Sequence, residues 1–233
     1  MEAEVRDKIV EVSKRLYLRG LVAGAGGNVS AYIRDEDVIF ITPSGLCKGY
    51  LKPEDIVKVD TSGKALEGAL KPTSELSFHL GIYRVREDVN AVVHAHPPVS
   101  TGFACAGTPI DYAVLPEVIA MIGEVRFVGY ETPTTRELAD KVAENIIGVE
   151  ALLLENHGII TVGSNLEQAY QRAELLEDLA KMILVARLLG GPRRLPDAEV
   201  RKIAGLESEK YRIKLAKERK GGGKTGIPES SNR

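Results

Sequence analysis

Three of the four histidines in this 233-residue chain follow apolar segments, where a strand would end at a cleft. His94 and His96 stand one residue apart after a pair of valines. In an extended strand, alternate side chains point to the same face, so the two imidazoles should project together. Pro97 lacks the N–H that a further ladder bond needs and should end the strand. His157 follows a second apolar run, and three imidazoles with an open fourth position are typical of a catalytic zinc site.

A His-x-His pair also occurs in two other classes of metal protein, and the sequence argues against both. A cupin needs a glutamate a few residues after the second histidine, whereas residues 97–101 contain none. A metal hydrolase on a (β/α)₈ barrel usually needs ~250 residues or more and regular strand–helix repeats, which this chain lacks. Imidazole also binds other divalent metals such as Co²⁺ or Mn²⁺, so the identity of the metal stays open.

The segment from residue 72 to residue 83 is predicted to be a helix that begins with polar groups. Thr73 or Ser74 is a suitable N-cap. Exposed N–H groups beside two hydroxyls form a natural phosphate site. Glu75 stands in the first turn, where the helix dipole favours a carboxylate. His79 follows one turn later, and we interpret it as a packed helix histidine rather than as a metal ligand.

Two loops could let a ligand approach the backbone. The glycine-rich segment at residues 23–30 lacks GxGxxG spacing and precedes an expected strand, so it does not indicate a dinucleotide site. Its glycines would still permit close approach of the backbone to a ligand. The loop at residues 42–45 follows another expected strand and offers a hydroxyl and an unhindered amide.

Composition describes an ordinary globular protein and excludes several classes of partner. The chain is 44% hydrophobic and 27% charged, with a net charge of −2 and both signs dispersed. Such a balance predicts no nucleic-acid or membrane partner, and no apolar run approaches the ~20 residues of a membrane span. Cys47 and Cys105 form no CxxC spacing, and the N-terminus is charged rather than signal-like. A cytoplasmic protein with reduced thiols is expected.

The pattern of elements predicts an α/β fold. Helices are expected at 2–19, 72–83, 97–106, 115–123, 135–147, 165–189 and 197–220, and strands at 29–33, 38–42, 57–60, 91–94, 125–130, 151–154 and 158–162. Strands often follow turns rather than long helices. The prediction is therefore a single three-layer α/β/α domain, with a largely antiparallel central sheet covered by helices on both faces. This domain should span residues 1–220, followed by a flexible tail at 221–233.

Five separated motifs, considered together, resemble one known family. They are Gly27-Asn28-Val29-Ser30, Thr42-Pro43-Ser44-Gly45, Thr73-Ser74-Glu75, His94-Ala95-His96-Pro97 and Asn156-His157-Gly158. Their order and spacing are similar to those of the class II aldolase/epimerase family, also called the aldolase II or adducin-like superfamily. The resemblance covers roughly residues 5–190.

The resemblance implies a role for each matched residue. His94, His96 and His157 would hold Zn²⁺, and Glu75 would be both the resting fourth ligand and the catalytic acid/base. A phosphate pocket would be lined by six residues: Gly27, Asn28, Ser44, Gly45, Thr73 and Ser74. Tyr112 would protonate the aldehyde-derived oxygen from across a subunit interface of a homotetramer. Tyr211 is the candidate for a further tyrosine from the C-terminal segment.

The implied reaction is reversible cleavage of an L-fuculose 1-phosphate-like ketose 1-phosphate. The products would be dihydroxyacetone phosphate and a short aldehyde such as lactaldehyde, formed through a metal-stabilised enediolate. Pentulose-5-phosphate 4-epimerases share the scaffold but usually carry aspartate at the position of Glu75, which favours the aldolase. Methylthioribulose-1-phosphate dehydratases share the metal motif and remain an alternative. An adducin-like interaction module is least favoured, because such domains lack the metal histidines.

Overall fold

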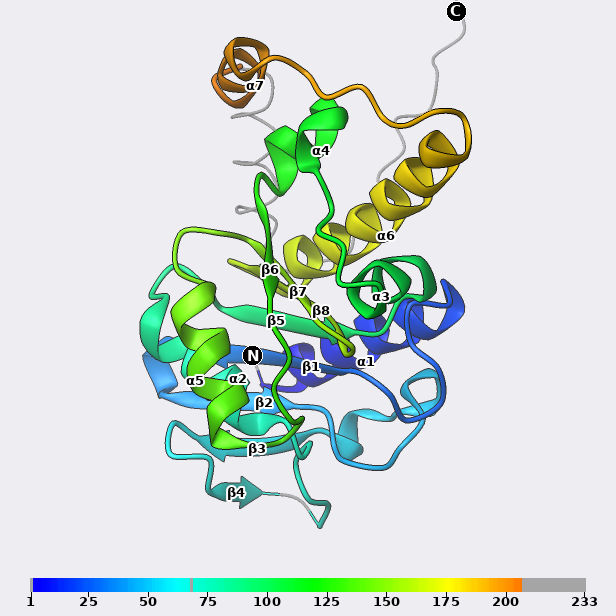
Figure 1. The fold of residues 1–233 in the computed structure, drawn as a ribbon. Helices are drawn as coiled ribbons and strands as arrows, with labels where there is room; N and C mark the ends of the chain where they lie inside the picture. Colours follow the sequence, from blue (N-terminus) through cyan, green and yellow to red (C-terminus); the bar gives the residue numbers. More distant parts are fainter. Residues whose placement is uncertain (1, 68, 207–233) are drawn as a thin grey trace, which may run out of the picture.

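One eight-stranded sheet forms the centre of the molecule (Figure 1). The computed structural model describes residues 2–67 and 69–206. The strands are β1 (Asn28–Ile33), β2 (Val38–Ile41), β3 (Val57–Asp60), β4 (Ala65–Glu67), β5 (Ala91–Ala95), β6 (Val125–Val128), β7 (Ala151–Leu154) and β8 (Gly158–Gly163). They lie in the order β4-β3-β2-β1-β5-β8-β7-β6, so β5 is an inner strand between β1 and β8.

The sheet is mostly antiparallel, as the sequence predicts. All neighbouring strands pair antiparallel except β6 and β7, which are parallel. The register places Asn28 of β1 opposite His94 of β5, and His94 opposite Ile160 of β8. The end of β5 is therefore held by hydrogen-bonded neighbours on both sides, which gives the histidine-bearing segment a rigid support.

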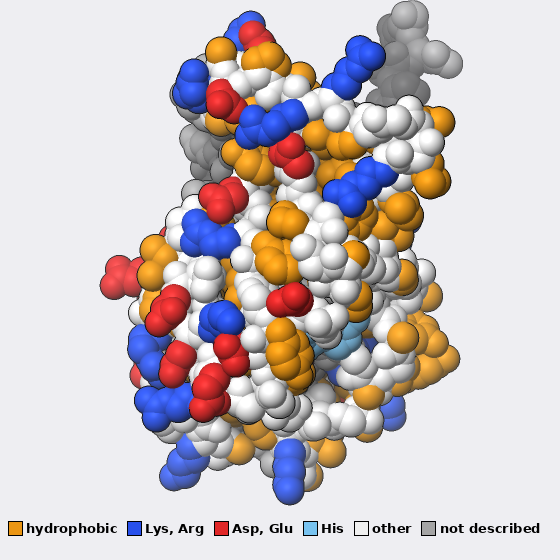
Figure 2. Space-filling view, viewed as in Figure 1, with side chains coloured by type: hydrophobic (Ala, Val, Ile, Leu, Met, Phe, Trp, Pro, Cys, Tyr) orange, Lys and Arg blue, Asp and Glu red, His pale blue; other side chains and the backbone are white. Residues whose placement is uncertain are grey.

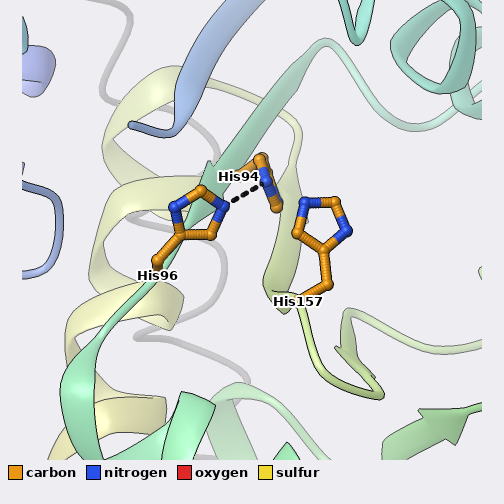
Figure 3. Close-up of side chains that lie close together, drawn as sticks. All are labelled: His94, His96 and His157. Carbon is orange, nitrogen blue, oxygen red and sulfur yellow. Dashed lines mark hydrogen bonds between the residues drawn. The ribbon is translucent and has the colours of Figure 1, made fainter. Parts of the chain in front are cut away.

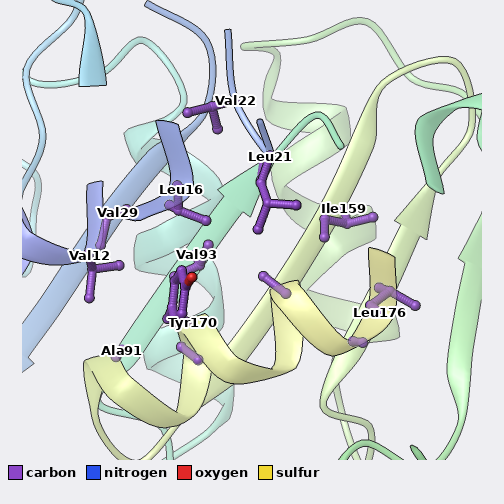
Figure 4. Packing of buried hydrophobic residues seen from close by; sticks show 14 of the residues in the cluster. Val12, Leu16, Leu21, Val22, Val29, Ala91, Val93, Ile159, Tyr170 and Leu176 are labelled. Atoms are coloured by element: carbon purple, nitrogen blue, oxygen red, sulfur yellow. The ribbon is translucent and has the colours of Figure 1, made fainter. Parts of the chain in front are cut away.

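Three helices pack on one face of the sheet, and a fourth packs against one of them. The three are α1 (Glu2–Leu18), α3 (Pro98–Cys105) and α6 (Leu166–Leu188), and α4 (Pro116–Met121) packs against α6. Their apolar side chains form one core cluster with alternate residues of the strands, among them Ala91, Val93 and Ala95 of β5. Figure 4 shows part of this layer, where Val12 and Leu16 of α1 approach the strand residues from the same side as Tyr170 of α6.

Two helices cover the opposite face. They are α2 (Leu76–Val85) and α5 (Arg136–Asn145), which also pack against each other. Their apolar side chains form a second core cluster, which contains Val92 of β5. Ala91 and Val93, on either side of Val92 in the sequence, belong to the first cluster. His94 has the same parity as Val92, so the period of two in the strand directs its side chain toward the layer of α2.

Helix boundaries follow local capping chemistry, with one correction. Thr135 and Asn165 cap α5 and α6 by accepting hydrogen bonds from the backbone N–H of the third residue of each helix. The expected N-cap of α2 at Thr73 or Ser74 is wrong, because this helix begins at Leu76 and Glu75 occupies the cap position. The Oγ1 atom of Thr73 accepts from the N–H of Glu75 instead.

The remaining elements are short. The part of the chain that the structure describes contains four 3₁₀ turns, η1 (Arg34–Glu36), η2 (Lys48–Tyr50), η3 (Pro53–Asp55) and η4 (Tyr112–Val114), and ends in a short helix, α7 (Asp197–Ala204). The helix expected over 197–220 is described only as far as α7. The rest of that segment, Tyr211 and the tail at 221–233 lie outside the described residues. Among the residues described, no helix combines the length and apolar content needed to cross a membrane.

Candidate functional site

His94 is fixed by its position in the sheet. It is fully buried, and its Nδ1 lies 2.9 Å from the carbonyl oxygen of Ile159 on β8. A carbonyl oxygen can only accept, so Nδ1 carries the proton and donates to it. The Nε2 atom of His94 therefore presents a lone pair, which is the form that binds a metal.

His157 lies in the tight turn that joins β7 to β8. Leu154 pairs with Gly158, and Asn156 takes a left-handed conformation with φ of 53° between them. Asparagine tolerates this region better than most residues. Gly158 is required for a different reason. A Cβ there would stand 2.4 Å from the carbonyl oxygen of Ala95 and 2.6 Å from Cδ2 of His96. The hairpin thus brings His157 beside the end of β5.

The three imidazoles converge on one point (Figure 3). One ring nitrogen from each of His94, His96 and His157 can be chosen so that all three lie within 4.8 Å of one another. The Nε2 atoms of His94 and His96 are 2.9 Å apart. Histidine is also visible from outside on one face of the molecule (Figure 2), and His96 and His157 are only partly buried.

Glu75 completes the group from the start of α2. Its Oε2 lies 3.3 Å from Nε2 of His94, and its Oε1 lies 3.1 Å from Nε2 of His157. Burial opposes ionisation of this carboxyl, but the neighbouring His94 and His157 outweigh burial and hold its pKa well below the usual range. Burial, followed by the proximity of His94 and His157, lowers the pKa of His96 to about 3. At neutral pH the site thus combines a carboxylate with a neutral His96.

The donor set fits a divalent cation. Among the described residues, Oε1 of Glu75 and Nδ1 of His157 are buried without a hydrogen-bond partner. Buried polar atoms are normally paired. Three imidazoles and one carboxylate also match the ligand chemistry of zinc, although other divalent metals accept the same set. His79, interpreted from sequence as a packed histidine, stands outside the group and is fully buried.

The residues expected around a phosphate come together near Glu75. The side-chain amide of Asn28 donates to Oγ1 of Thr73 over 3.2 Å and to Oε2 of Glu75 over 2.8 Å. The backbone N–H of Ser44 donates to the carbonyl of Lys71, and Pro43 forms a bridge with Pro72. The loop that contains Ser44 and Gly45 therefore runs alongside the segment that contains Thr73 and Ser74.

Gly27 is needed for the same assembly. It has φ of +69°, and a Cβ would stand 2.7 Å from the carbonyl oxygen of His94. Only glycine combines this conformation with such close approach. The glycine-rich segment can therefore pass directly over the end of β5, next to the histidines.

Lys48 is a charged residue of this region that sequence reasoning missed. Its side chain is 2% exposed, and its Nζ donates to the carbonyls of Ala25 and Leu46. It thereby links the glycine-rich segment to the loop after Gly45. Burial lowers the pKa of Lys48 to about 8. Sequence offered no signal, because a lysine in a loop without apolar periodicity is ordinarily solvated.

Tyr112 makes none of the described contacts with Glu75 or the three histidines. It belongs to η4, is half-buried, and packs against the larger core cluster. Within residues 2–67 and 69–206, no hydrogen bond or ring contact joins it to Glu75 or the histidines.

Comparison with known proteins gives consistent matches. The family described as the class II aldolase and adducin N-terminal domain matches residues 7–184. The chain is 39% identical over 200 residues to a 5-deoxy-D-ribulose 1-phosphate aldolase of Bacillus thuringiensis serovar kurstaki, covering 85% of this chain and 93% of that one. It is also 39% identical over 175 residues to an L-fuculose phosphate aldolase of Methanococcus maripaludis, covering 75% and 93%.

Solved structures agree with these matches. A structure of an L-fuculose 1-phosphate aldolase superimposes with a TM-score of 0.80 at 36% sequence identity. The superposition covers 89% of this chain and 96% of that chain. Near-complete coverage of the relatives means that the likeness extends over their whole fold rather than over one motif.

Proposed function

The chain belongs to the class II aldolase and adducin N-terminal domain family, and from this premise we propose that it is a metal-dependent aldolase. It reversibly cleaves a ketose 1-phosphate to dihydroxyacetone phosphate and a short aldehyde. The observation that carries the proposal is the convergence of His94, His96 and His157 with the buried carboxylate of Glu75. An adducin-like binding module would have no use for this buried donor set.

The four side chains would hold one divalent cation, for which we propose Zn²⁺. When bound, the cation supplies Lewis-acid stabilisation for negative charge that develops on the ketose oxygens. The protein supplies the orientation. His94 is held in the correct tautomer by the carbonyl of Ile159, and the turn at Asn156 presents His157.

Glu75 is proposed as the group that moves a proton at carbon. During cleavage, the C4 hydroxyl loses its proton and the C3–C4 bond breaks, with its electron pair passing toward the C2 carbonyl. C3 then needs a proton, and Glu75 can deliver one after its carboxylate has taken up a proton from water. Glu75 is suited to return to the anionic form, since its neighbours favour the carboxylate. In the synthesis direction the same carboxylate removes a proton from C3 of dihydroxyacetone phosphate.

Tyr112 is proposed to exchange the proton of the C4 oxygen, supplied by a neighbouring subunit of a homotetramer. Its place in η4, away from the histidines of its own chain, is compatible with such an arrangement. We keep Tyr211 as the candidate for a second tyrosine from the C-terminal segment. We also propose that residues 1–220 form one catalytic domain in a cytoplasmic enzyme.

The phosphate group is proposed to bind between the loops that meet beside Glu75. Backbone and hydroxyl groups of Gly27, Ser44, Gly45 and Ser74 would surround it, together with Asn28 and Thr73. Lys48 adds a positive charge that links two of these loops. Binding energy from a phosphate distant from the reacting bond can position the ketose for reaction.

The names of the relatives support ketose 1-phosphates as substrates. A 5-deoxypentulose 1-phosphate would release acetaldehyde on cleavage between C3 and C4, and a 6-deoxyhexulose 1-phosphate would release lactaldehyde. We propose the second, L-fuculose 1-phosphate-like substrate, and regard the first as its direct competitor because of the aldolase with 39% identity over 200 residues.

A panel of sugar phosphates tests the reaction type. Metal-replete protein is incubated separately with L-fuculose 1-phosphate, 5-deoxyribulose 1-phosphate, a pentulose 5-phosphate and methylthioribulose 1-phosphate. Formation of dihydroxyacetone phosphate from a 1-phosphate is the expected result. Epimerisation of the pentulose 5-phosphate, or loss of water from methylthioribulose 1-phosphate without carbon–carbon cleavage, would replace the aldolase with the corresponding alternative. Trapping of a lysine adduct by borohydride would indicate a Schiff-base enzyme instead.

A further inference from the structure

A continuous chain of hydrogen bonds runs behind the histidine site and ends on Glu75. Tyr83 Oη and Ser30 Oγ are 2.6 Å apart, and Ser30 Oγ and Nδ1 of His79 are 2.7 Å apart. Nε2 of His79 lies 2.5 Å from Oδ1 of Asn28, whose amide nitrogen donates to Oε2 of Glu75 over 2.8 Å. Ser30 and His79 are fully buried, and Asn28 and Tyr83 are each 3% exposed.

The elements explain why these residues meet. Asn28 and Ser30 are alternate residues of β1, so they share a face of the sheet. Glu75, His79 and Tyr83 are spaced by four residues at and within α2, so they share a face of the helix. The hydrogen bonds therefore join one face of β1 to one face of α2. Both ring nitrogens of His79 take part in them.

The negative charge of Glu75 determines which partner donates in each hydrogen bond of this series. An ionised carboxylate can only accept, so Asn28 must turn its NH₂ group toward Glu75 and its oxygen toward His79. His79 must then carry its proton on Nε2 and accept at Nδ1 from Ser30. Ser30 in turn accepts from the hydroxyl of Tyr83. A reversed chain would aim the amide oxygen of Asn28 at the carboxylate, with two acceptors in contact.

Burial makes His79 suited to hold one tautomer. Its ring lies against Phe78, with centroids 4.7 Å apart, and burial lowers its pKa to about 3. A neutral imidazole without access to water keeps the hydrogen bonds that the protein provides. The second amide hydrogen of Asn28 is held by Thr73, so this amide cannot rotate without losing two bonds.

We propose that His79 is a positioning residue for the reaction, acting on Glu75 through Asn28. It locks the amide of Asn28 in the orientation that donates to Oε2, and so fixes where the carboxylate stands when it exchanges a proton with carbon. The inference rests on the proposed function, because it gives Glu75 the acid/base role. It also gives the fourth histidine of the chain a role beyond packing.

A pair of variants separates this role from packing. His79→Phe retains a ring in the same space but donates to nothing. His79→Gln keeps an N–H near the position of Nε2. Since removal of a group that orients a metal ligand typically costs about 10–100-fold, His79→Phe should lose that factor in kcat, with KM and bound metal unchanged. The same loss is expected in the exchange of the C3 proton of dihydroxyacetone phosphate with deuterated water. His79→Gln should recover most of both rates.

Two outcomes of this pair would overturn the proposal. One is a wild-type exchange rate in His79→Phe at full metal loading. The other is an equal loss of exchange rate in His79→Gln and His79→Phe, which would assign the effect to packing. Thermal unfolding of both variants, followed by circular dichroism, verifies that the compared proteins are folded.

A spectroscopic measurement tests the same inference without any activity. Protein labelled with ¹⁵N-histidine and loaded with zinc should show, for one histidine, a protonated Nε2 and an unprotonated Nδ1, and these signals should vanish in His79→Gln. The opposite tautomer, or a mixture, would contradict the proposed chain. If wild-type protein shows this tautomer but neither cleaves sugar phosphates nor exchanges the C3 proton, the proposed function fails while the hydrogen-bond chain stands.

Discussion

Glu75 is the residue on which the chemistry depends, because its two oxygens have different surroundings. Oε2 receives a hydrogen bond from Asn28, whereas Oε1 is buried with no hydrogen-bond partner among the described residues and faces His157. A buried carboxylate without full compensation is costly, so the site favours a cation beside it. Oε1 is therefore the oxygen best placed to alternate between a cation and a transferred proton.

Replacement of Glu75 by glutamine tests the acid/base role. Glu75→Gln keeps the size of the side chain and one oxygen, but the amide cannot remove a proton from C3 or return it. Proton transfer by a positioned group is worth about 10²–10⁴-fold, so kcat and C3 proton exchange should fall by that factor. The three histidines should still retain metal, measured by elemental analysis. Glu124→Gln, at an exposed ion pair with Arg126, is the control. An exchange rate in Glu75→Gln equal to that of the control would remove Glu75 from the mechanism.

Lys48 is expected to act on phosphate binding rather than on bond cleavage. Lys48→Met removes the charge beside the phosphate loops and should raise KM about tenfold, the effect of roughly 1.4 kcal/mol, with a smaller change in kcat. Because burial lowers the pKa of Lys48 to about 8, the wild-type lysine loses its charge as the pH rises through that value. The wild-type kcat/KM should therefore fall above about pH 8.

The pH profile of the variant is the decisive comparison for Lys48. Lys48→Met has no charge to lose there, so the fall of kcat/KM near pH 8 should be absent. The same alkaline fall in both proteins would show that another group titrates, and that Lys48 only links the two loops.

At the scale of elements, the site depends on where a strand, a hairpin and two helices begin or end. β5 ends at Ala95, so His96 leaves the sheet directly beside the turn that carries His157. The next element, α3, begins at Pro98 and is capped by a residue distant in sequence. Glu177 of α6, 1% exposed, accepts from the backbone N–H groups of Val99 and Ser100 and from the hydroxyl of Ser100.

Loss of this cap should destabilise the segment that follows His96. Glu177→Gln removes the negative charge from the N-terminus of α3 and leaves one acceptor for three donors. The free energy of unfolding should fall by about 1.5–3 kcal/mol, the range for hydrogen bonds to charged groups. Urea denaturation of metal-free protein measures it. The control is Glu174→Gln, one turn earlier and partly exposed, whose change should stay within about 1 kcal/mol. Equal effects of the two variants would rule out a specific cap.

Gly158 links the hairpin to the histidines, and its replacement should damage metal binding. In Gly158→Ala the added Cβ meets the carbonyl of Ala95 and the ring of His96, so one of them must move. Metal affinity should fall about 10–100-fold, measured by competition with a chelator of known affinity. Gly102→Ala, in α3 with open space at the Cβ position, should leave the affinity unchanged. Wild-type affinity in Gly158→Ala would contradict the described packing.

At the scale of the whole molecule, the sheet divides the protein into a structural face and a site face. The larger core cluster packs α1, α3 and α6 against one side, while α2 brings Glu75, His79 and Tyr83 to the other. A single strand contributes to both faces: Val93 of β5 belongs to the larger core cluster, and Val92 belongs to the cluster on the side of α2. The site is therefore built on inner strands that are packed on both faces, which limits motion of the ligands.

The features that sequence could predict are those set by local periodicity. The His-x-His pair at the end of an apolar strand, the hairpin break at His157 and the two-sided sheet all follow from alternation and turn residues. Other features depend on contacts across the fold. The start of α2 at Leu76, the burial of Lys48 and the chain through His79 arise from segments that meet only in the folded protein. β4 has three exposed residues and no apolar alternation, so no pattern predicted it.

The central claim is that this chain makes and breaks a carbon–carbon bond with help from a metal held at His94, His96 and His157. The direct measurement is condensation of dihydroxyacetone phosphate with lactaldehyde, followed by chromatography of the sugar phosphate. Zinc-loaded protein should form a 6-deoxyketose 1-phosphate, chelator-stripped protein should not, and added zinc should restore the reaction. No product from loaded protein with lactaldehyde or acetaldehyde, or full activity after verified removal of all metal, would contradict the account.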